Sequence, residues 1–358
     1  MKSSVRLFIP GPVEVREELL GELSQPMIGH RSPAFSDLYT EVITGLRAFL
    51  QTKNHIYLST SSSTGLMEAA IRNCVKERCL NLACGAFSHR WHQIALACGR
   101  DAELLEVSWG SGFSPQLLDE ALSKKHYEAV TLVHNETSTG VMNPLAPLAE
   151  VMAGYPEIFF LVDCVSSMGG VPIAIDEWGI DVALAGIQKA FGLPPGLSVA
   201  VVAPRVLEKS ESLSDVGYYF SFPIFESYAL RHQTPTTPAI PQLFALRRQL
   251  AEFAGEGRAN RFQRHARMAA RVQEWGLRHF DLFAEEGFRS DTVTCIRGTE
   301  SLSIAELIAH VQESGYQIAN GYGPLRNKTF RIAHMGDRRE TELEDLLSQI
   351  EQSLETMS

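Results

Sequence analysis

The feature that most constrains the fold is a series of short apolar runs that alternate with helical patterns between residues 55 and 205. Several of these runs lack the polar alternation of a strand with one solvated face, which is typical of strands buried on both sides. Such strands, separated by helices, predict an α/β fold with a mostly parallel seven-stranded sheet covered by helices. The runs read HIYLST, CLNLACG, DAELLEVS, AVTLVHNE, IFFLVDCV, DVALAGI and LSVAVVAP.

The pattern of apolar and polar residues changes after this region. A long amphipathic helical pattern covers roughly Ala239 to Phe280 and is followed by a shorter alternation of strand and helix patterns. We therefore expect a large domain over residues 16–255 and a smaller C-terminal α/β domain over residues 256–358. The N-terminal segment, residues 1–15, is expected to pack on the small domain.

Chemistry-bearing residues follow the predicted strands, at the edge of a parallel sheet where ligands bind. Lys189 follows the apolar run DVALAGI, and Asp163 closes the run IFFLVD. A lysine desolvated at this edge would have a depressed pKa and a nucleophilic neutral amine, whereas an ordinary lysine would extend to the surface. Asp163 is expected either to cap the next segment or to pair with a protonated pyridine nitrogen.

A hydroxyl-rich turn precedes the helical pattern STGLMEAAIRNCV, which begins at about Ser63. The free N–H groups at the start of such a helix, together with the hydroxyls of Ser62, Ser63 and Thr64, are suited to holding a phosphate. Serine is also the preferred helix cap, so a purely structural role stays open. The number of hydroxyls exceeds what one cap needs, which favours an anion site.

Three further segments carry polar or aromatic residues at predicted strand ends or inside a strand. Phe87 leaves one strand end, where it can stack on a flat ring or pack in the core. The loop HNETSTG places Thr137 at another strand end. Arg331 lies within the apolar run TFRIA, and a buried guanidinium requires a carboxylate, which belongs either to the protein or to a substrate.

Composition excludes several classes of function. The chain of 358 residues has a formal net charge of −10 and no basic block, which argues against nucleic acid as a partner. Its six cysteines are scattered without metal-ligand spacing, so we expect neither a disulfide framework nor a metal site. The N-terminal apolar patch is too short for a signal peptide, and no apolar run reaches membrane-spanning length. We therefore expect a cytoplasmic protein without a membrane partner.

In their order, these motifs resemble the class V family of pyridoxal 5'-phosphate (PLP) aminotransferases of fold type I. The similarity extends from residue 8 to about residue 340. Within the family, the chain most resembles the branch of alanine–glyoxylate and serine–pyruvate aminotransferases. The motifs that carry it are PGP, IGHRSPAF, SSSTGLMEAA, GAFSHRW, HNETSTGV, LVDCVSSMGG, GIQKAFGLPPG, QTPTTPAI and FRIAHMGD.

The resemblance implies that Lys189 binds the cofactor covalently, that Asp163 pairs with its pyridine nitrogen and that Phe87 stacks on its ring. It implies further that Thr137 approaches the ring's phenolic oxygen and that Arg331 binds the substrate α-carboxylate. The implied phosphate ligands are Ser62, Ser63, Thr64 and Gln188, with Thr234 and Thr237 reaching the site of the neighbouring subunit in a homodimer. Ser63 replaces a glycine that many relatives have in this turn.

The implied reaction moves the amino group of alanine or serine to glyoxylate or pyruvate by a ping-pong mechanism. One alternative is a phosphoserine or aspartate aminotransferase, in which His30 and Arg31 bind an anionic side chain. A second is a cysteine desulfurase-like lyase; against it, Gln188 rather than histidine precedes Lys189, and no cysteine follows Cys295. A third is a binding module without activity, which the presence of the lysine, aspartate and arginine disfavours.

Overall fold

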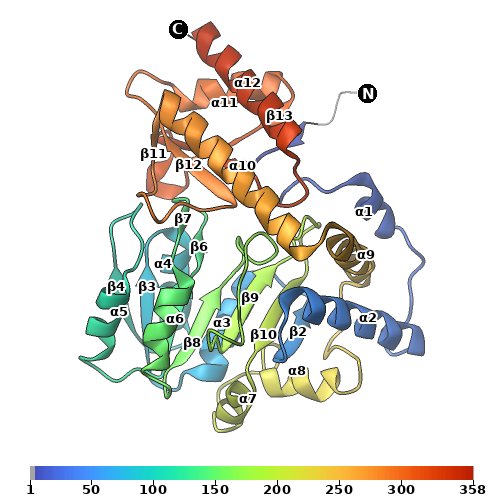
Figure 1. The fold of residues 1–358 in the computed structure, drawn as a ribbon. Helices are drawn as coiled ribbons and strands as arrows, with labels where there is room; N and C mark the ends of the chain where they lie inside the picture. The colour runs from blue at the N-terminus through green and yellow to red at the C-terminus, as the bar shows by residue number, and fades with distance from the viewer. Residues whose placement is uncertain (1–4, 358) are drawn as a thin grey trace.

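The computed structural model describes residues 5–357, so the first four residues of the predicted N-terminal segment lie outside the described part (Figure 1). Within it, the largest sheet has seven strands, and these are the seven runs predicted from the sequence. Strand β10 runs antiparallel to both of its neighbours, while β9, β8, β5, β3 and β4 are mutually parallel. In spatial order the strands are β2 (His55–Ser59), β10 (Ser198–Val202), β9 (Val182–Gly186), β8 (Phe159–Asp163), β5 (Ala129–Val133), β3 (Arg78–Ala83) and β4 (Asp101–Glu106).

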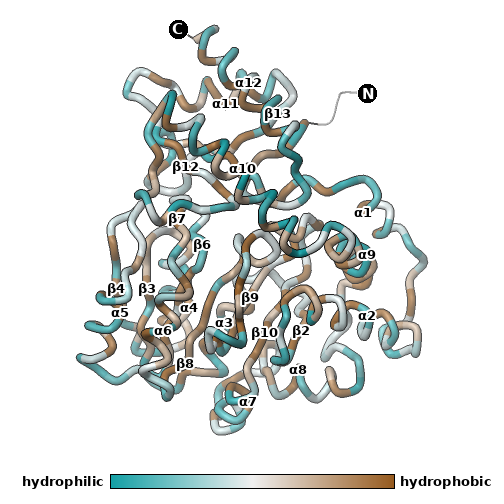
Figure 2. Tube along the Cα trace, in the orientation of Figure 1, coloured by the Kyte–Doolittle hydropathy of each residue, from teal (hydrophilic) through white to brown (hydrophobic). Residues whose placement is uncertain are grey.

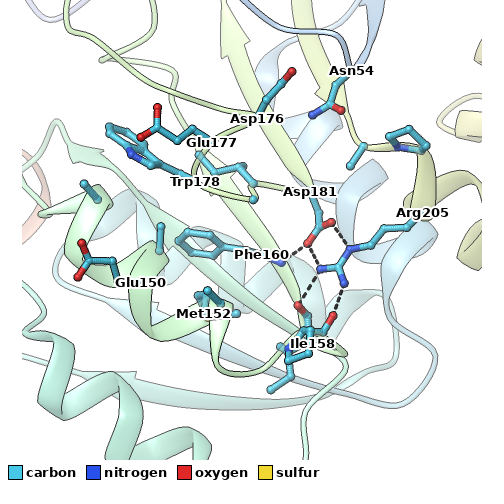
Figure 3. Close-up of a pocket in the computed structure, with 18 residues that line it drawn as sticks. Asn54, Glu150, Met152, Ile158, Phe160, Asp176, Glu177, Trp178, Asp181 and Arg205 are labelled. Carbon is cyan, nitrogen blue, oxygen red and sulfur yellow. Dashed lines mark hydrogen bonds and ion pairs between the residues drawn. The ribbon is translucent and has the colours of Figure 1, made fainter.

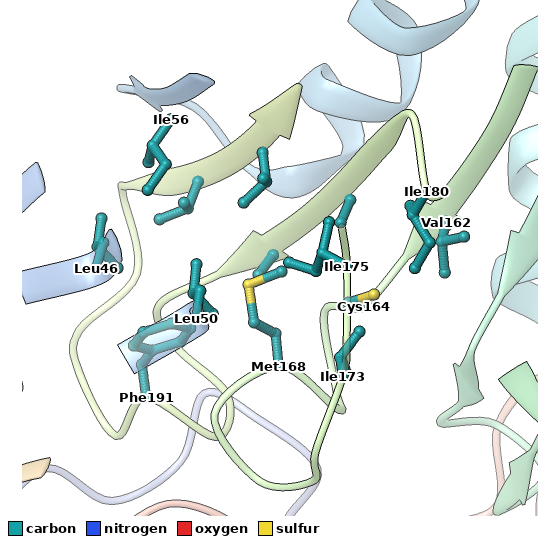
Figure 4. Close-up of a cluster of buried hydrophobic side chains, with 14 of the residues drawn as sticks. Leu46, Leu50, Ile56, Val162, Cys164, Met168, Ile173, Ile175, Ile180 and Phe191 are labelled. Carbon is teal, nitrogen blue, oxygen red and sulfur yellow. The ribbon is translucent and has the colours of Figure 1, made fainter. Parts of the chain in front are cut away.

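Helices cover both faces of this sheet, which explains why its strands lack polar alternation. In β8, for example, Val162 contributes to the hydrophobic cluster on one face and Leu161 to the cluster on the other. Figure 2 shows the central strands as mainly hydrophobic, and Figure 4 shows part of the first cluster, around Met168 and Phe191. The first face is covered by α2 (Pro33–Leu50), α5 (Pro115–Leu122), α6 (Leu145–Ala153) and α9 (Ile240–Glu256), and the second by α3 (Ser63–Cys74), α4 (Ala86–Ala97), α7 (Pro204–Glu211) and α8 (Phe222–Ala229).

A second, four-stranded sheet has the order β11-β12-β15-β14 and lies with α10, α11 and α12 at the top of Figure 1. The N-terminal strand β1 (Arg6–Leu7) pairs in parallel with β13 (Tyr316–Gln317), so the chain start lies against this part of the molecule. The bounds are β11 (Asp281–Leu282), β12 (Val293–Arg297), β14 (Ala319–Asn320), β15 (Thr329–Ala333), α10 (Arg258–His279), α11 (Ile304–Glu313) and α12 (Glu340–Met357). The remaining elements are α1 (Glu17–Glu22), the two-residue strands β6 (Asn135–Glu136) and β7 (Val141–Met142), and the 3-10 helix η1 (Gly323–Leu325).

The long helical pattern of residues 239–280 forms two helices rather than one. Gly257 has φ +82°, a left-handed conformation that ends α9, and its carbonyl oxygen accepts a hydrogen bond from Arg261 N–H at the start of α10. Glycine adopts this conformation at little cost, which is why the amphipathic pattern continues while the helix axis does not. The break lies close to the expected boundary near residue 255; the division into domains stays a prediction.

Candidate active site

Two adjoining cavities meet at Lys189, beyond the carboxyl ends of the parallel strands. The inner cavity, of about 360 Å³, lies against the ends of β5, β8 and β9. The outer cavity, of about 520 Å³, lies between Ile9–Gly11, α11 and β14. Five residues line both: Gly11, Phe87, Thr137, Lys189 and Tyr322. A ligand in the inner cavity and a second one in the outer cavity would therefore meet at the lysine.

Burial, together with the positive charges of Arg331 and Arg90, lowers the pKa of Lys189 to about 8, against the opposing effect of Asp163. The Nζ atom donates a hydrogen bond to the Pro10 carbonyl oxygen. Gly11 makes room for this side chain, because a Cβ atom at Gly11 would lie 2.6 Å from Lys189 Cδ. Lys189 is thus a partly buried amine that can be neutral near physiological pH and that faces both cavities.

Asp163 ends β8 and lines the inner cavity with a side chain that is almost fully buried. Burial raises the pKa of its carboxyl to about 7; the hydrogen bond from Val165 N–H to Oδ1 opposes this, Glu136 adds to it and Lys189 opposes it. The Val165 contact is the one hydrogen bond to this carboxyl among residues 5–357. A cation in the inner cavity would offset the cost of desolvation and restore the carboxylate.

Helix α3 begins at the inner cavity without a side-chain cap. The Ser63 hydroxyl is buried and has no hydrogen-bond partner in the described chain. A Cβ atom at Gly186 would lie 2.5 Å from both Ser63 Oγ and Gln188 Oε1, so this glycine allows the two side chains to approach the end of β9. Ser62 has φ −72° and ψ 159°, and Ser63 is the first helical residue, so serine in place of the glycine expected from the resemblance introduces no left-handed backbone. Free helix N–H groups and an unpartnered hydroxyl fit an anion such as phosphate.

Phe87 lines both cavities from the first turn of α4, which a buried carboxylate holds in place. Glu136 accepts hydrogen bonds from the backbone N–H groups of Phe87 and Ser88, at 3.1 and 2.9 Å. Gly85 permits this approach, because its Cβ atom would lie 2.5 Å from Glu136 Cγ. Thr137, next in the chain, contacts Ser166 with 2.6 Å between the two hydroxyl oxygens. The loop HNETSTG therefore both caps α4 and supplies a hydroxyl to the cavities.

Arg331 lies in β15, lines the outer cavity and is only 7% exposed. Its guanidinium donates to the carbonyl oxygens of Asn320 and Thr137, at distances of 2.9 to 3.2 Å. No carboxylate of residues 5–357 forms an ion pair with it. The expected carboxylate partner is therefore not internal, and the cation is free to bind an anionic ligand.

Four predicted site residues do not line either cavity within this chain: His30, Arg31, Thr234 and Thr237. Arg31 donates instead to the carbonyl oxygens of Thr234 and Pro235. Within this chain Arg31 therefore packs on the QTPTTP segment, and the assignment of His30 and Arg31 to an anionic substrate side chain stays a prediction. The prediction for Thr234 and Thr237 concerns a neighbouring subunit and stays a prediction.

The structure adds residues that the sequence did not single out as site residues. Asn135 is buried in the inner cavity, and neither polar atom of its side chain has a partner in the described residues. Its position just after β5, at the edge of the sheet where ligands bind, could have identified it from the sequence. Gly11, Arg90 and Tyr322 also line the site. Tyr322 follows a two-residue strand, which leaves no periodicity to identify it.

A larger cavity, of about 670 Å³, lies at the opposite edge of the sheet, where β8 and β9 begin (Figure 3). Its Asp181 and Arg205 form a pair with two contacts of 2.5 Å, and Arg205 also donates to the carbonyl oxygens of Pro156 and Ile158. Because Arg205, the cation of this cavity, is already paired with Asp181, it is less available to an anionic ligand than the unpaired Arg331 at the smaller site. In residues 5–357, no group of histidine, cysteine and acidic side chains is placed to hold a metal ion, all six cysteines are unpaired, and no helix is long and apolar enough to cross a membrane.

Comparison with known proteins identifies the class to which this fold and site belong. Residues 14–314 match the family model "Aminotransferase class-V", and the chain belongs to this family. Its fold is fold type I, and the chain is an aminotransferase that acts on an amino acid and an oxo acid. The family depends on PLP.

The chain is similar over nearly its whole length to curated relatives and to a solved structure. It is 36% identical to an uncharacterized aminotransferase of Methanocaldococcus jannaschii, covering 98% of this chain and 93% of the relative. It is 34% identical to the L-aspartate–glyoxylate aminotransferase of Paracoccus denitrificans (94% and 87%) and to the serine–glyoxylate aminotransferase of Methylorubrum extorquens (97% and 90%). The structure of an alanine–glyoxylate aminotransferase from Nostoc sp. superposes with a TM-score of 0.93 at 30% identity, covering 99% of this chain and 96% of the other.

Proposed function

We propose that this aminotransferase moves the amino group of a small neutral amino acid, alanine or serine, to glyoxylate or pyruvate. The observation that carries the proposal is Arg331, a buried guanidinium with no carboxylate partner in the described chain, which lines the outer cavity together with Lys189. These two are the cationic residues of the outer cavity, and much of its remaining wall is apolar: Ile9, Ala305, Ile308, Ile318 and Ala319. Such a site suits one carboxylate and a short neutral side chain.

The inner cavity fits PLP on the evidence of its own unsatisfied groups. The orphaned Ser63 hydroxyl and the uncapped α3 N-terminus suit the phosphate, with Thr64 and Gln188 beside them. Asp163 suits the pyridine N–H, and Thr137 the phenolic oxygen. Phe87 supplies a ring for stacking. When bound through Lys189, the cofactor supplies an electron sink for the electron pair of the substrate's Cα–H bond.

Lys189 and Asp163 have separate roles in this proposal. The Lys189 Nζ, once free and neutral, takes the proton from the substrate Cα and would deliver it to the cofactor's former aldehyde carbon, which then bears the amino nitrogen. Its lowered pKa, from burial and from Arg331, keeps the neutral form accessible. The Asp163 carboxylate keeps the ring nitrogen protonated. This pairing compensates the desolvation that otherwise raises the pKa of the Asp163 carboxyl to about 7.

We propose that the two substrates use the outer cavity in turn, which gives ping-pong kinetics. Arg331 binds the α-carboxylate of the amino donor, and the resulting oxo acid must leave before the acceptor's carboxylate takes the same place. Overall, the donor gives up its amino group and Cα hydrogen and takes its new carbonyl oxygen from water, while the acceptor gains the amino group and a hydrogen and releases its carbonyl oxygen as water. Glyoxylate as acceptor is supported by the names of the relatives, which include serine–glyoxylate and alanine–glyoxylate aminotransferases.

The active form is proposed to be a cytoplasmic homodimer. Thr234 and Thr237 lie away from the cavities of their own chain, and the family resemblance assigns them to the phosphate of the neighbouring subunit. Arg31 contacts the same segment. The alternative reading, an anionic donor such as aspartate or phosphoserine, is favoured by the L-aspartate–glyoxylate relative and would require Arg31 to act in the partner's site.

The deciding experiment is a half-reaction screen. The PLP-loaded protein is mixed separately with alanine, serine, aspartate, glutamate and phosphoserine, and the visible absorbance of the cofactor is followed. Rapid bleaching by alanine or serine is expected. Bleaching only by aspartate, glutamate or phosphoserine would contradict the proposal and favour an anionic donor.

Two variants separate the roles of the residues. Lys189→Ala is expected to abolish turnover and the visible band of the lysine-bound cofactor. Arg31→Ala is expected to affect alanine and phosphoserine equally; a loss confined to phosphoserine would instead assign Arg31 to an anionic side chain.

A further inference from the structure

Tyr322 stands where the two cavities meet and lines both of them. Its ring centroid is 5.3 Å from that of Phe87, and the Arg331 guanidinium carbon is 5.8 Å from the centre of the Tyr322 ring. The tyrosine ring therefore lies close both to the aromatic side chain proposed to stack on the cofactor and to the cation proposed to bind the substrate carboxylate.

The backbone around Tyr322 has little freedom. Gly321 donates a backbone hydrogen bond to Thr329 at 2.7 Å, and a Cβ atom at Gly321 would lie 2.0 Å from the Leu325 carbonyl oxygen. On the other side, Gly323 has φ +56°. The turn between β14 and η1 is thus tightly closed, and it fixes the point from which the tyrosine ring projects.

Arg90 holds the other end of the same side chain. Its Nη2 atom donates to the Tyr322 hydroxyl at 3.1 Å, and its guanidinium lies 4.9 Å from the Phe87 ring centre. Arg90 belongs to α4 and Tyr322 to the segment after β14, so the contact joins the large sheet's side of the site to the second sheet. Arg90 forms no ion pair with a carboxylate of residues 5–357. Among these residues, Tyr322 is the one whose side chain is hydrogen-bonded to Arg90.

We propose that Tyr322, held by Arg90, is a specificity-determining residue that limits the length of the amino donor's side chain. The inference rests on the proposed function. A donor whose carboxylate is on Arg331 and whose amino group is at Lys189 has its Cα between these two groups. Tyr322 lines both cavities beside this point, so that a donor side chain of more than one or two carbons that extends along the junction would have to displace the ring from its hydrogen bond.

The kinetic test uses a linear series of donors: alanine, 2-aminobutyrate and norvaline. For Tyr322→Ala, we expect the ratio of kcat/KM for norvaline to that for alanine to rise about 100-fold over the wild type, which is about tenfold for each of norvaline's two additional methylenes. Tyr322→Phe and Arg90→Met each keep an aromatic ring at position 322 but remove its hydrogen bond to residue 90. Each should therefore raise the ratio less than Tyr322→Ala does, mainly by lowering KM for norvaline. Arg90→Lys, which retains a donor, should restore part of the limit.

Tyr155→Ala is the matched control, since Tyr155 binds Asp119 and lines neither cavity. It should leave the ratio unchanged. A ratio for Tyr322→Ala equal to that of the control, in protein that still transaminates alanine, would overturn the inference. Failure of the wild type to transaminate any donor would instead contradict the proposed function.

A binding measurement tests the size limit without turnover. Calorimetric titration of the PLP-loaded protein with acetate, propionate, butyrate and valerate should show affinity falling for the longer acids in the wild type. In Tyr322→Ala the affinity should rise with chain length, because each added methylene then gains apolar contact. If Tyr322→Ala fails to fold, Tyr322→Phe and Arg90→Met carry both tests, and identical carboxylate profiles for these variants and the wild type would refute the inference.

Discussion

Gly11→Ala is predicted to reduce turnover far more than it reduces stability. The added Cβ atom would lie 2.6 Å from Lys189 Cδ, 2.9 Å from Cε and 3.0 Å from Nζ, whereas ordinary contacts begin at 3.4 Å. The lysine side chain must therefore move by about 1 Å, and a displacement of this size at a reacting group costs about 100-fold in rate. Gly11 has φ +104°, so alanine there also costs about 1–2 kcal/mol of backbone strain.

The assay compares kcat for the favoured donor with the free energy of unfolding in denaturant. Gly287→Ala is the control, because Gly287 has φ +89° and a Cβ atom there would meet nothing within 4 Å. Both variants should lose similar stability, and only Gly11→Ala should lose turnover. If Gly11→Ala retained wild-type kcat, or if the control lost turnover to the same extent, the steric argument for Lys189 would be refuted.

Two further predictions concern the buried carboxyl groups. Glu136→Gln places an amide among the N–H and O–H donors of Phe87, Ser88 and Ser138, so the free energy of unfolding should fall by about 2–3 kcal/mol; unchanged denaturant stability would contradict the capping role. For Asp163, the pKa of about 7 in the folded, cofactor-free chain exceeds the usual value near 4, so the folded state holds a proton that the unfolded state has lost. Cofactor-free wild type should therefore lose stability relative to Asp163→Asn as pH rises from 4 to 7, and parallel stability curves for the two proteins would count against this burial effect.

The sequence predicted the fold because its strongest signal is local. All seven apolar runs are strands of one sheet, and Lys189 and Asp163 lie at the edge where parallel strands end. The antiparallel direction of β10 could not be predicted from the sequence, since the side-chain periodicity of a strand is the same in both directions. The break at Gly257 was missed because the amphipathic pattern continues across it.

The site itself was only partly readable. Residues that directly follow long strands were identified, whereas Tyr322 and Arg90 depend on a contact between segments 232 positions apart. Sequence patterns carry no information about such a contact. Arg31 shows the opposite case: its motif is recognisable, yet within this chain its guanidinium binds backbone carbonyl groups of a distant loop.

The site differs from the rest of the interior because its buried charged groups lack partners within the described chain. Glu136 is fully buried, but its oxygens are occupied by donors of α4 and of its own loop, so it serves the fold. Arg261 is equally buried and is paired with Asp337 and Glu256. Lys189, Asp163 and Arg331 form no ion pair with any described residue, and burial shifts the pKa of each toward its neutral form. Because unpaired buried charges cost several kcal/mol each, three such groups around two adjoining cavities support the proposed ligands: a cation for Asp163, an aldehyde for Lys189 and a carboxylate for Arg331.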